Sequence, residues 1–118
     1  MKPLVINQRH CAVDGAIEVV ALQGRLAVEN EAQLTAALQQ ALSGCARGLI
    51  LDMSAVEFVS SAGLRVLYMI YKQAGQEGKH LAMFGVQPAV YKILKIVASE
   101  AAFSVCDSEE DAAKGWPT

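Results

Sequence analysis

Residues 49–67, with the sequence LILDMSAVEFVSSAGLRVL, join an apolar strand to an apolar helix. The unbroken apolar run at 49–51 is typical of a strand buried on both faces of a sheet. Ser60 and Ser61 precede the helix, and Gly63 falls within its first turn. The first N–H groups of a helix have no partner within it, and the helix dipole favours negative charge there. A phosphate on such a serine would be tolerated locally, and it would add close to two negative charges to a neutral surface.

The rest of the chain alternates between strand patterns and helix patterns. Apolar runs predict strands at residues 4–6, 16–23, 48–51, 80–84 and 103–106. Apolar residues at helical spacing predict helices at residues 30–42 and 61–76, and further helices that begin near residues 88 and 108. This order predicts a mixed α/β fold, with a mixed central sheet of about four or five strands and about four helices packed on it.

Local signals predict where several of these elements begin and end. Gly24 is expected to end the second strand, and Asp52 and Ser54 are expected to mark the polar end of the central strand. Asn30 is expected to cap the first long helix, with Gln33 three residues later completing a box-like start.

Length and composition limit the classes of protein that fit. A chain of 118 residues is long enough for one domain with a core of its own, so residues 1–118 are expected to form a single domain. No apolar run approaches the roughly 18–20 residues that span a bilayer, and MKPLVINQRH lacks the apolar centre of a signal peptide. A cytoplasmic protein without direct membrane insertion is therefore expected.

Charge and motif content argue against nucleic-acid binding and catalysis. The net charge is −2, whereas nucleic-acid binding requires clustered Lys and Arg. Three cysteines and two histidines lack the spacing of a metal site, so neither a metal nor a cofactor is expected. The chain has no G-x-S-x-G elbow and no P-loop. We expect a protein that is not an enzyme and has no catalytic residues.

Three segments resemble the STAS-domain family, and within it the stand-alone anti-sigma-factor antagonists of bacteria. LILDMSAVEFVSSAGLRVL is similar to the family's strand that ends in Asp, followed by Asp-Ser-Ser/Thr-Gly-Leu at a helix start. LQGRLAVENEAQL is similar to its L-x-G-x-L-D segment, and VQPAVYKIL to its S-P-A-V helix start. The resemblance extends over residues 4–111, and the first of the three motifs is the most specific.

The resemblance implies a binding module that is switched by phosphorylation. It places the phosphoacceptor at Ser61, with Gly63 and Leu64 as the motif glycine and leucine. The implied partner is an anti-sigma factor that is also a serine kinase with a histidine-kinase-like ATP fold. The unphosphorylated antagonist would bind this kinase and free the sigma factor. Phosphate would block binding until a metal-dependent phosphatase of the protein-phosphatase-2C (PP2C) type removes it.

The chain departs from the family pattern at three positions. Ser60 stands where the family often has Asp, Ala62 where it often has Ser or Thr, and Ala27 where a loop Asp helps to meet the kinase. These differences remove two acidic contacts from the implied docking surface and leave the acceptor hydroxyl in place.

Several residues in this region have two interpretations. Ser61 is either the phosphoacceptor or a plain helix cap, and Ser60 is both the expected cap and the alternative acceptor. Gly63 allows close packing of helix on strand, gives a partner or an active site room to approach the hydroxyl, or does both. Met69 either belongs to a protein-binding face or is ordinary surface scatter. Tyr68 and Tyr71 are expected in the core, with their hydroxyls at its margin.

The implied partner surface comprises the loop after the second strand, the start of the helix predicted at residues 61–76, and the stripe of that helix that is expected to face solvent. Its residues are Arg25, Ala27, Asn30, Ser60, Ser61, Ala62, Gly63, Arg65, Met69 and Lys72. Two other functions of STAS proteins remain as alternatives. One is a subunit of a membrane-lipid ABC transporter that docks permanently on its ATPase, and the other is a nucleotide-binding STAS module.

Overall fold

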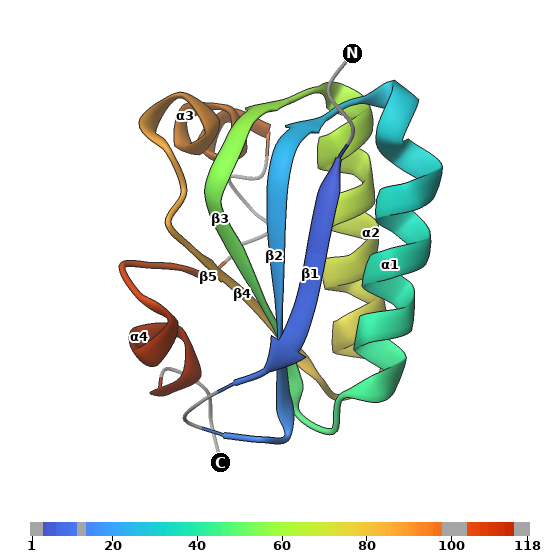
Figure 1. Ribbon diagram of the computed structural model, residues 1–118, viewed down its shortest axis with the longest axis vertical. Helices are drawn as coiled ribbons and strands as arrows, with labels where there is room; N and C mark the ends of the chain where they lie inside the picture. Colours follow the sequence, from blue (N-terminus) through green and yellow to red (C-terminus); the bar gives the residue numbers. More distant parts are fainter. Residues whose placement is uncertain (1–3, 12–13, 98–103, 115–118) are drawn as a thin grey trace.

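The structure is a computed structural model that describes residues 4–11, 14–97 and 104–114. Within them, the strands form one sheet in the order β1-β2-β3-β4-β5. β1 pairs antiparallel with β2, and each later pair is parallel. The strands are β1 (Val5–His10), β2 (Ile17–Leu26), β3 (Gly48–Val59), β4 (His80–Phe84) and β5 (Ser104–Cys106). The helices are α1 (Glu31–Gly44), α2 (Ser61–Gln76), α3 (Pro88–Val97) and α4 (Glu109–Lys114), and a 3-10 turn η1 (Val28–Asn30) precedes α1. The predicted mixed α/β architecture is confirmed (Figure 1).

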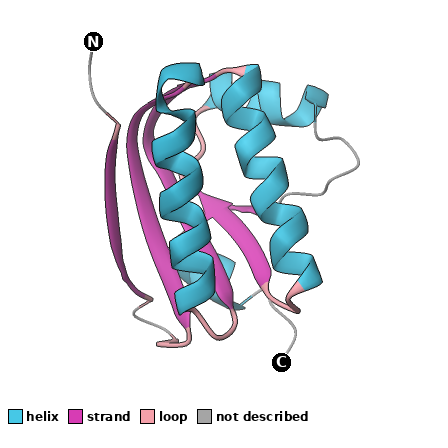
Figure 2. Cartoon of the chain, turned by 90° about the vertical axis from the view of Figure 1, so that its right-hand side faces the viewer, coloured by secondary structure: helices cyan, strands magenta, loops and turns pink. Residues whose placement is uncertain are grey.

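The helices cover the sheet unequally. α1 and α2 lie side by side on one face (Figure 2), and both begin at the same end of the molecule (Figure 1). Because successive strand residues point to opposite faces, Leu49 and Leu51 enter the main core beneath these helices, whereas Ile50 enters a smaller core. α4 supplies Ala112 and Ala113 to that smaller core. None of the helices in the described ranges is long and apolar enough to cross a membrane.

The prediction that Gly24 ends the second strand was wrong. β2 continues to Leu26, and Gly24 has a φ of 121°, a conformation that glycine adopts without steric cost. The register of β2 on β3 shifts between Gly24 and Arg25, as in a β-bulge. The glycine therefore bends the strand and does not stop it.

The expected polar end of the central strand was also wrong, because β3 continues to Val59. Asp52 Oδ1 accepts hydrogen bonds from the Ser54 backbone N at 3.0 Å and the Ser54 hydroxyl at 2.6 Å. These hydrogen bonds lie where the register of β3 on β2 shifts, between the pairs Ala21–Asp52 and Gln23–Ala55. β3 continues to the start of α2 because it stays paired with β2 up to Val59. The local sequence of β3 does not show this pairing.

Asn30 does not cap α1 through its side chain. Its Nδ2 donates to the Arg25 carbonyl at 2.7 Å, and Gln33 Nε2 donates to the Leu4 carbonyl at 3.0 Å. Both side chains bond to backbone carbonyls outside α1, so the predicted capping box is replaced by contacts to the end of β2 and to the residue before β1. Tyr68 is 45% exposed, which contradicts its expected place in the core, whereas Tyr71 packs partly buried against it. Phe103, the first residue of the predicted fifth strand, lies outside the described residues.

Candidate functional site

Ser60 joins the end of β3 to the start of α2. It is extended, with φ −84° and ψ 174°, and its backbone N donates to the Leu26 carbonyl at 2.8 Å. Its hydroxyl accepts a hydrogen bond from the Gly63 backbone N at 3.2 Å. Ser60 is thus the N-cap of α2, which confirms the prediction for this residue.

Ser61 is the first residue of α2, and it is exposed. In the described part of the chain its hydroxyl makes no hydrogen bond, because the capping bond belongs to Ser60. It therefore lies in solvent at the positive end of a sixteen-residue helix. This geometry suits a phosphoacceptor, although modification of Ser61 stays a prediction.

Gly63 sets how closely α2 approaches the sheet. A Cβ at this position would lie 2.4 Å from the Leu26 carbonyl oxygen and 2.9 Å from the Leu26 Cβ. No larger residue fits without moving backbone. The predicted close packing of helix on strand is confirmed, and room for a partner to approach Ser61 stays a prediction. The packing also fixes the first turn of α2, and with it the position of Ser61.

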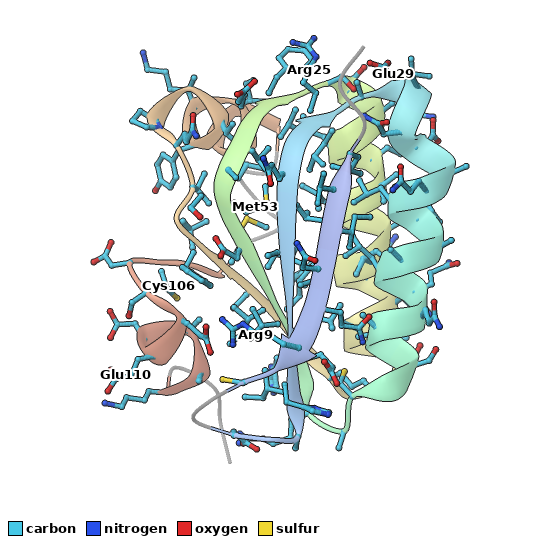
Figure 3. The ribbon with its side chains drawn as sticks, viewed as in Figure 1. Arg9, Arg25, Glu29, Met53, Cys106 and Glu110 are labelled. Atoms are coloured by element: carbon cyan, nitrogen blue, oxygen red, sulfur yellow. The ribbon has the colours of Figure 1, made fainter. Side chains whose placement is uncertain are left out.

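The surface around the start of α2 carries mixed charge and apolar groups. The Arg25 guanidinium lies 4.3 Å from the centroid of the Phe58 ring, a cation–π contact that holds the arginine at the end of the sheet. Arg25 and Glu29 project at the same end of the molecule (Figure 3). Val28 is 70% exposed. The sequence analysis placed the loop that contains Val28 and Glu29 on the partner surface but did not single out either residue.

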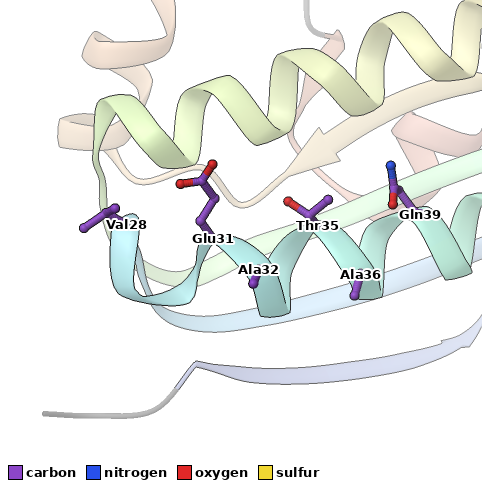
Figure 4. A pocket seen from close by; sticks show the side chains of 6 residues that line it. All are labelled: Val28, Glu31, Ala32, Thr35, Ala36 and Gln39. Atoms are coloured by element: carbon purple, nitrogen blue, oxygen red, sulfur yellow. The ribbon is translucent and has the colours of Figure 1, made fainter.

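A shallow groove along α1 continues from this surface. It is lined by Val28, Glu31, Ala32, Thr35, Ala36 and Gln39. Glu31, Thr35 and Gln39 reach from α1 towards α2 (Figure 4). Across the two helices, Arg65 Nη1 lies 3.9 Å from Glu31 Oε1, and Gln39 Nε2 lies 3.5 Å from Gln73 Oε1. The exposed stripe of α2 therefore adjoins the groove.

The residues of the implied partner surface fall into two groups. Arg25, Ser61, Arg65, Met69 and Lys72 are exposed and could touch a partner directly. Ser60 is half-buried, whereas Ala27, Asn30, Ala62 and Gly63 are buried. The buried group can only shape the surface through the backbone positions that it fixes.

The three cysteines are free thiols; Cys11 and Cys45 are buried, and Cys106 is partly buried. Cys45 donates its thiol to the Leu42 carbonyl at 3.1 Å, and burial raises the pKa of the Cys45 and Cys106 thiols. A raised pKa lowers the thiolate fraction at neutral pH and hence the nucleophilicity. Among the described residues, no group of three or more His, Cys, Asp or Glu could hold a metal ion.

Comparison with known proteins relates the whole chain to a family. The sequence is 32% identical over 106 residues, 90% of each chain, to BtrV of Bordetella bronchiseptica, a provisionally assigned anti-sigma factor antagonist. An anti-sigma factor antagonist from Mycobacterium paratuberculosis matches with a TM-score of 0.81, at 22% identity over 94% of this chain and 92% of the other. SpoIIAA of Bacillus in its phosphorylated form matches with a TM-score of 0.71, at 18% identity over 93% of this chain and 97% of the other. Residues 10–112 match the family model of the STAS domain. The chain belongs to the STAS domain family.

Proposed function

We propose that this protein is an anti-sigma factor antagonist whose binding to an anti-sigma factor is switched by phosphorylation of Ser61. Its similarity to BtrV supports the class of protein. The observation that carries the switch is the division between two serines: Ser60 caps α2, and the Ser61 hydroxyl is exposed beside it. The protein would act as a kinase substrate and a binding module in the cytoplasm, without catalytic activity of its own.

The partner would be an anti-sigma factor that is also a serine kinase with a histidine-kinase-like ATP fold. In the transfer, Ser61 Oγ forms a bond to the γ-phosphorus of ATP, and the bond from that phosphorus to the β–γ bridging oxygen breaks. ADP leaves, and the hydroxyl proton passes to a base of the kinase. A PP2C-type phosphatase would later hydrolyse the ester and restore the hydroxyl.

Phosphorylation would oppose docking through charge and desolvation. Ser61, Arg25 and Val28 lie on the surface that would face the partner. A dianion placed there must lose its hydration when the interface forms, and it repels any acidic group across the interface. Unphosphorylated protein would therefore bind, and phosphorylated protein would be released.

The test has two parts that use the anti-sigma factor kinase. Peptide mass spectrometry after incubation with ATP should place phosphate on Ser61 in the wild type and in Ser60→Ala, and should find none in Ser61→Ala. Calorimetry should show that Ser61→Ala binds the kinase as the wild type does and that Ser61→Asp binds roughly tenfold or more weakly. Equal binding by Ser61→Asp and Ser61→Ala would overturn the charge switch.

A further inference from the structure

Arg65 lies one helical turn after Ser61 on the same face of α2. Residues at positions i and i+4 of a helix are neighbours on its surface. Helical side chains lean towards the N-terminus, so a long side chain at 65 covers the turn that begins at 61. Ser61 is exposed, and the Arg65 side chain is 72% exposed. The guanidinium can therefore reach a group attached to the Ser61 oxygen without any movement of the backbone.

The present contact of Arg65 is weak. Its Nη1 lies 3.9 Å from Glu31 Oε1, beyond hydrogen-bonding distance. A solvent-exposed pair of this kind contributes little to stability. Little free energy is therefore lost if Arg65 leaves Glu31 and binds an anion with which it can form hydrogen bonds.

The other cations of this surface are less suited to that exchange. Arg25 stacks on Phe58, and the Lys72 ammonium lies 5.6 Å from the centroid of the Tyr68 ring. Lys72 is also eleven positions beyond Ser61, about 16 Å along the helix axis. In the halves of β2 and β3 that lead to this end of the sheet, the charged residues are Arg25 and Glu57, and the neighbouring η1 and α1 add Glu29 and Glu31.

We propose that Arg65 binds the phosphate of phosphorylated Ser61 and releases Glu31 when it does so. A guanidinium can form two charge-assisted hydrogen bonds to a phosphate, which makes it a stronger partner for that group than for a distant carboxylate. Phosphorylation would then change the docking surface at two places. It adds an anion at Ser61, and it also withdraws a cation that an acidic partner surface could otherwise use. This inference rests on the proposed function only for the choice of Ser61 as acceptor.

The experiment installs phosphoserine at position 61 during translation, so that no kinase is needed. A ³¹P NMR titration then measures the second pKa of the phosphate. Arg65→Gln should raise this pKa by about 0.3–0.5 units, because an exposed opposite charge within a few ångströms stabilises the dianion only modestly. Arg65→Lys, which keeps the charge but loses the two-pronged contact, should give an intermediate pKa. Lys72→Gln carries the same charge change on the same helix and should shift the pKa by less than about 0.1 units.

Unchanged pKa values in Arg65→Gln, or an equal shift in Lys72→Gln, would overturn the assignment of Arg65. Thermal unfolding of the unphosphorylated variants checks that each one folds as the wild type does. The result is separable from the proposed function. A kinase that never modifies Ser61 would overturn the switch whatever the NMR shows, and an unaltered phosphate pKa would leave the switch standing without its Arg65 contact.

Discussion

Ser60 and Ser61 are chemically identical, yet their hydroxyls do different things. The Ser60 hydroxyl oxygen accepts a hydrogen bond from the Gly63 amide N–H, and the Ser61 side chain is exposed to solvent. The difference arises because Ser60 is still extended whereas Ser61 is already helical. A single position along the chain thus separates a structural role from a candidate regulatory one.

The two serines should respond differently to substitution. Ser60→Ala leaves the Gly63 amide without its acceptor and should lower the free energy of unfolding by about 1 kcal/mol. Ser61→Ala removes a hydroxyl that makes no bond in the described structure and should change it by less than about 0.5 kcal/mol. Urea unfolding followed by circular dichroism measures both. The opposite ranking would show that Ser61 is the cap.

At the scale of elements, the approach of α2 to β2 depends on Gly63. Gly63→Ala would place a methyl group 2.4 Å from a backbone oxygen. It should lower the free energy of unfolding by about 3 kcal/mol, the upper end of the usual cost of overpacking, even though alanine favours helices.

Gly75→Ala on the same helix is the matched control, since a Cβ there meets nothing within 4 Å. Gly75→Ala should stabilise by up to about 1 kcal/mol. Denaturant midpoints that move in the same direction for both variants would refute the packing argument.

The turn between β1 and β2 is tied to the start of β3 through Asp14. Asp14 Oδ1 accepts from the Ala16 backbone N at 2.9 Å, and Oδ2 pairs with Arg47. The Ala16 hydrogen bond first, and then the Arg47 contact, hold the pKa of Asp14 below its ordinary value. Because the folded pKa is the lower one, this contribution to stability is present at neutral pH and is lost as the pH falls through the ordinary and then the folded value.

Asp14→Asn should therefore be less stable than the wild type at pH 7. Its stability should fall less steeply with acidification below about pH 4, and the two proteins should converge once Asp14 is protonated. Thermal melts at a series of pH values provide the measurement. Curves that stay parallel through the acid range would contradict the linkage.

At the scale of the whole molecule, the two cores differ in size. The main core joins α1, α2 and α3 to the sheet, whereas the described residues of α4 give only Ala112 and Ala113 to the smaller one. An ion pair from Arg9 of β1 to Glu109 also holds α4. Regions with few buried apolar contacts open at lower free energy than the rest of a protein.

Hydrogen exchange should reveal this hierarchy. The amides of α4 should exchange faster than those of α1 and α2, and Arg9→Gln should accelerate α4 further while α2 keeps its protection. Mass spectrometry of peptic peptides can resolve the two regions. Equal protection of α4 and α2 would show that both belong to one cooperative unit.

Much of this architecture was predictable from the chain. His80–Phe84, the helix Ser61–Gln76 and the proline that begins α3 lie where the sequence patterns predict them. Sequence reasoning was wrong at Gly24, Asp52 and Asn30, because strand pairing and distant carbonyls outweighed local signals there. The exposure of Tyr68 was missed because the periodicity of α2 shows which face is apolar but not how far neighbouring elements cover the margins of that face.

The sequence by itself determined that apolar strands and helices alternate, that one helix opens with two serines and a glycine, and that the motif is that of a family. These properties depend on neighbours in the chain, and local propensity and periodicity record them. Only the tertiary structure decided that Gly63 rests on Leu26, that Val28 is exposed, and that Arg65 lies near Glu31. The Gly63–Leu26 and Arg65–Glu31 contacts join residues about 30–40 positions apart, and only the packing of separate elements brings such residues together or leaves a side chain such as Val28 uncovered.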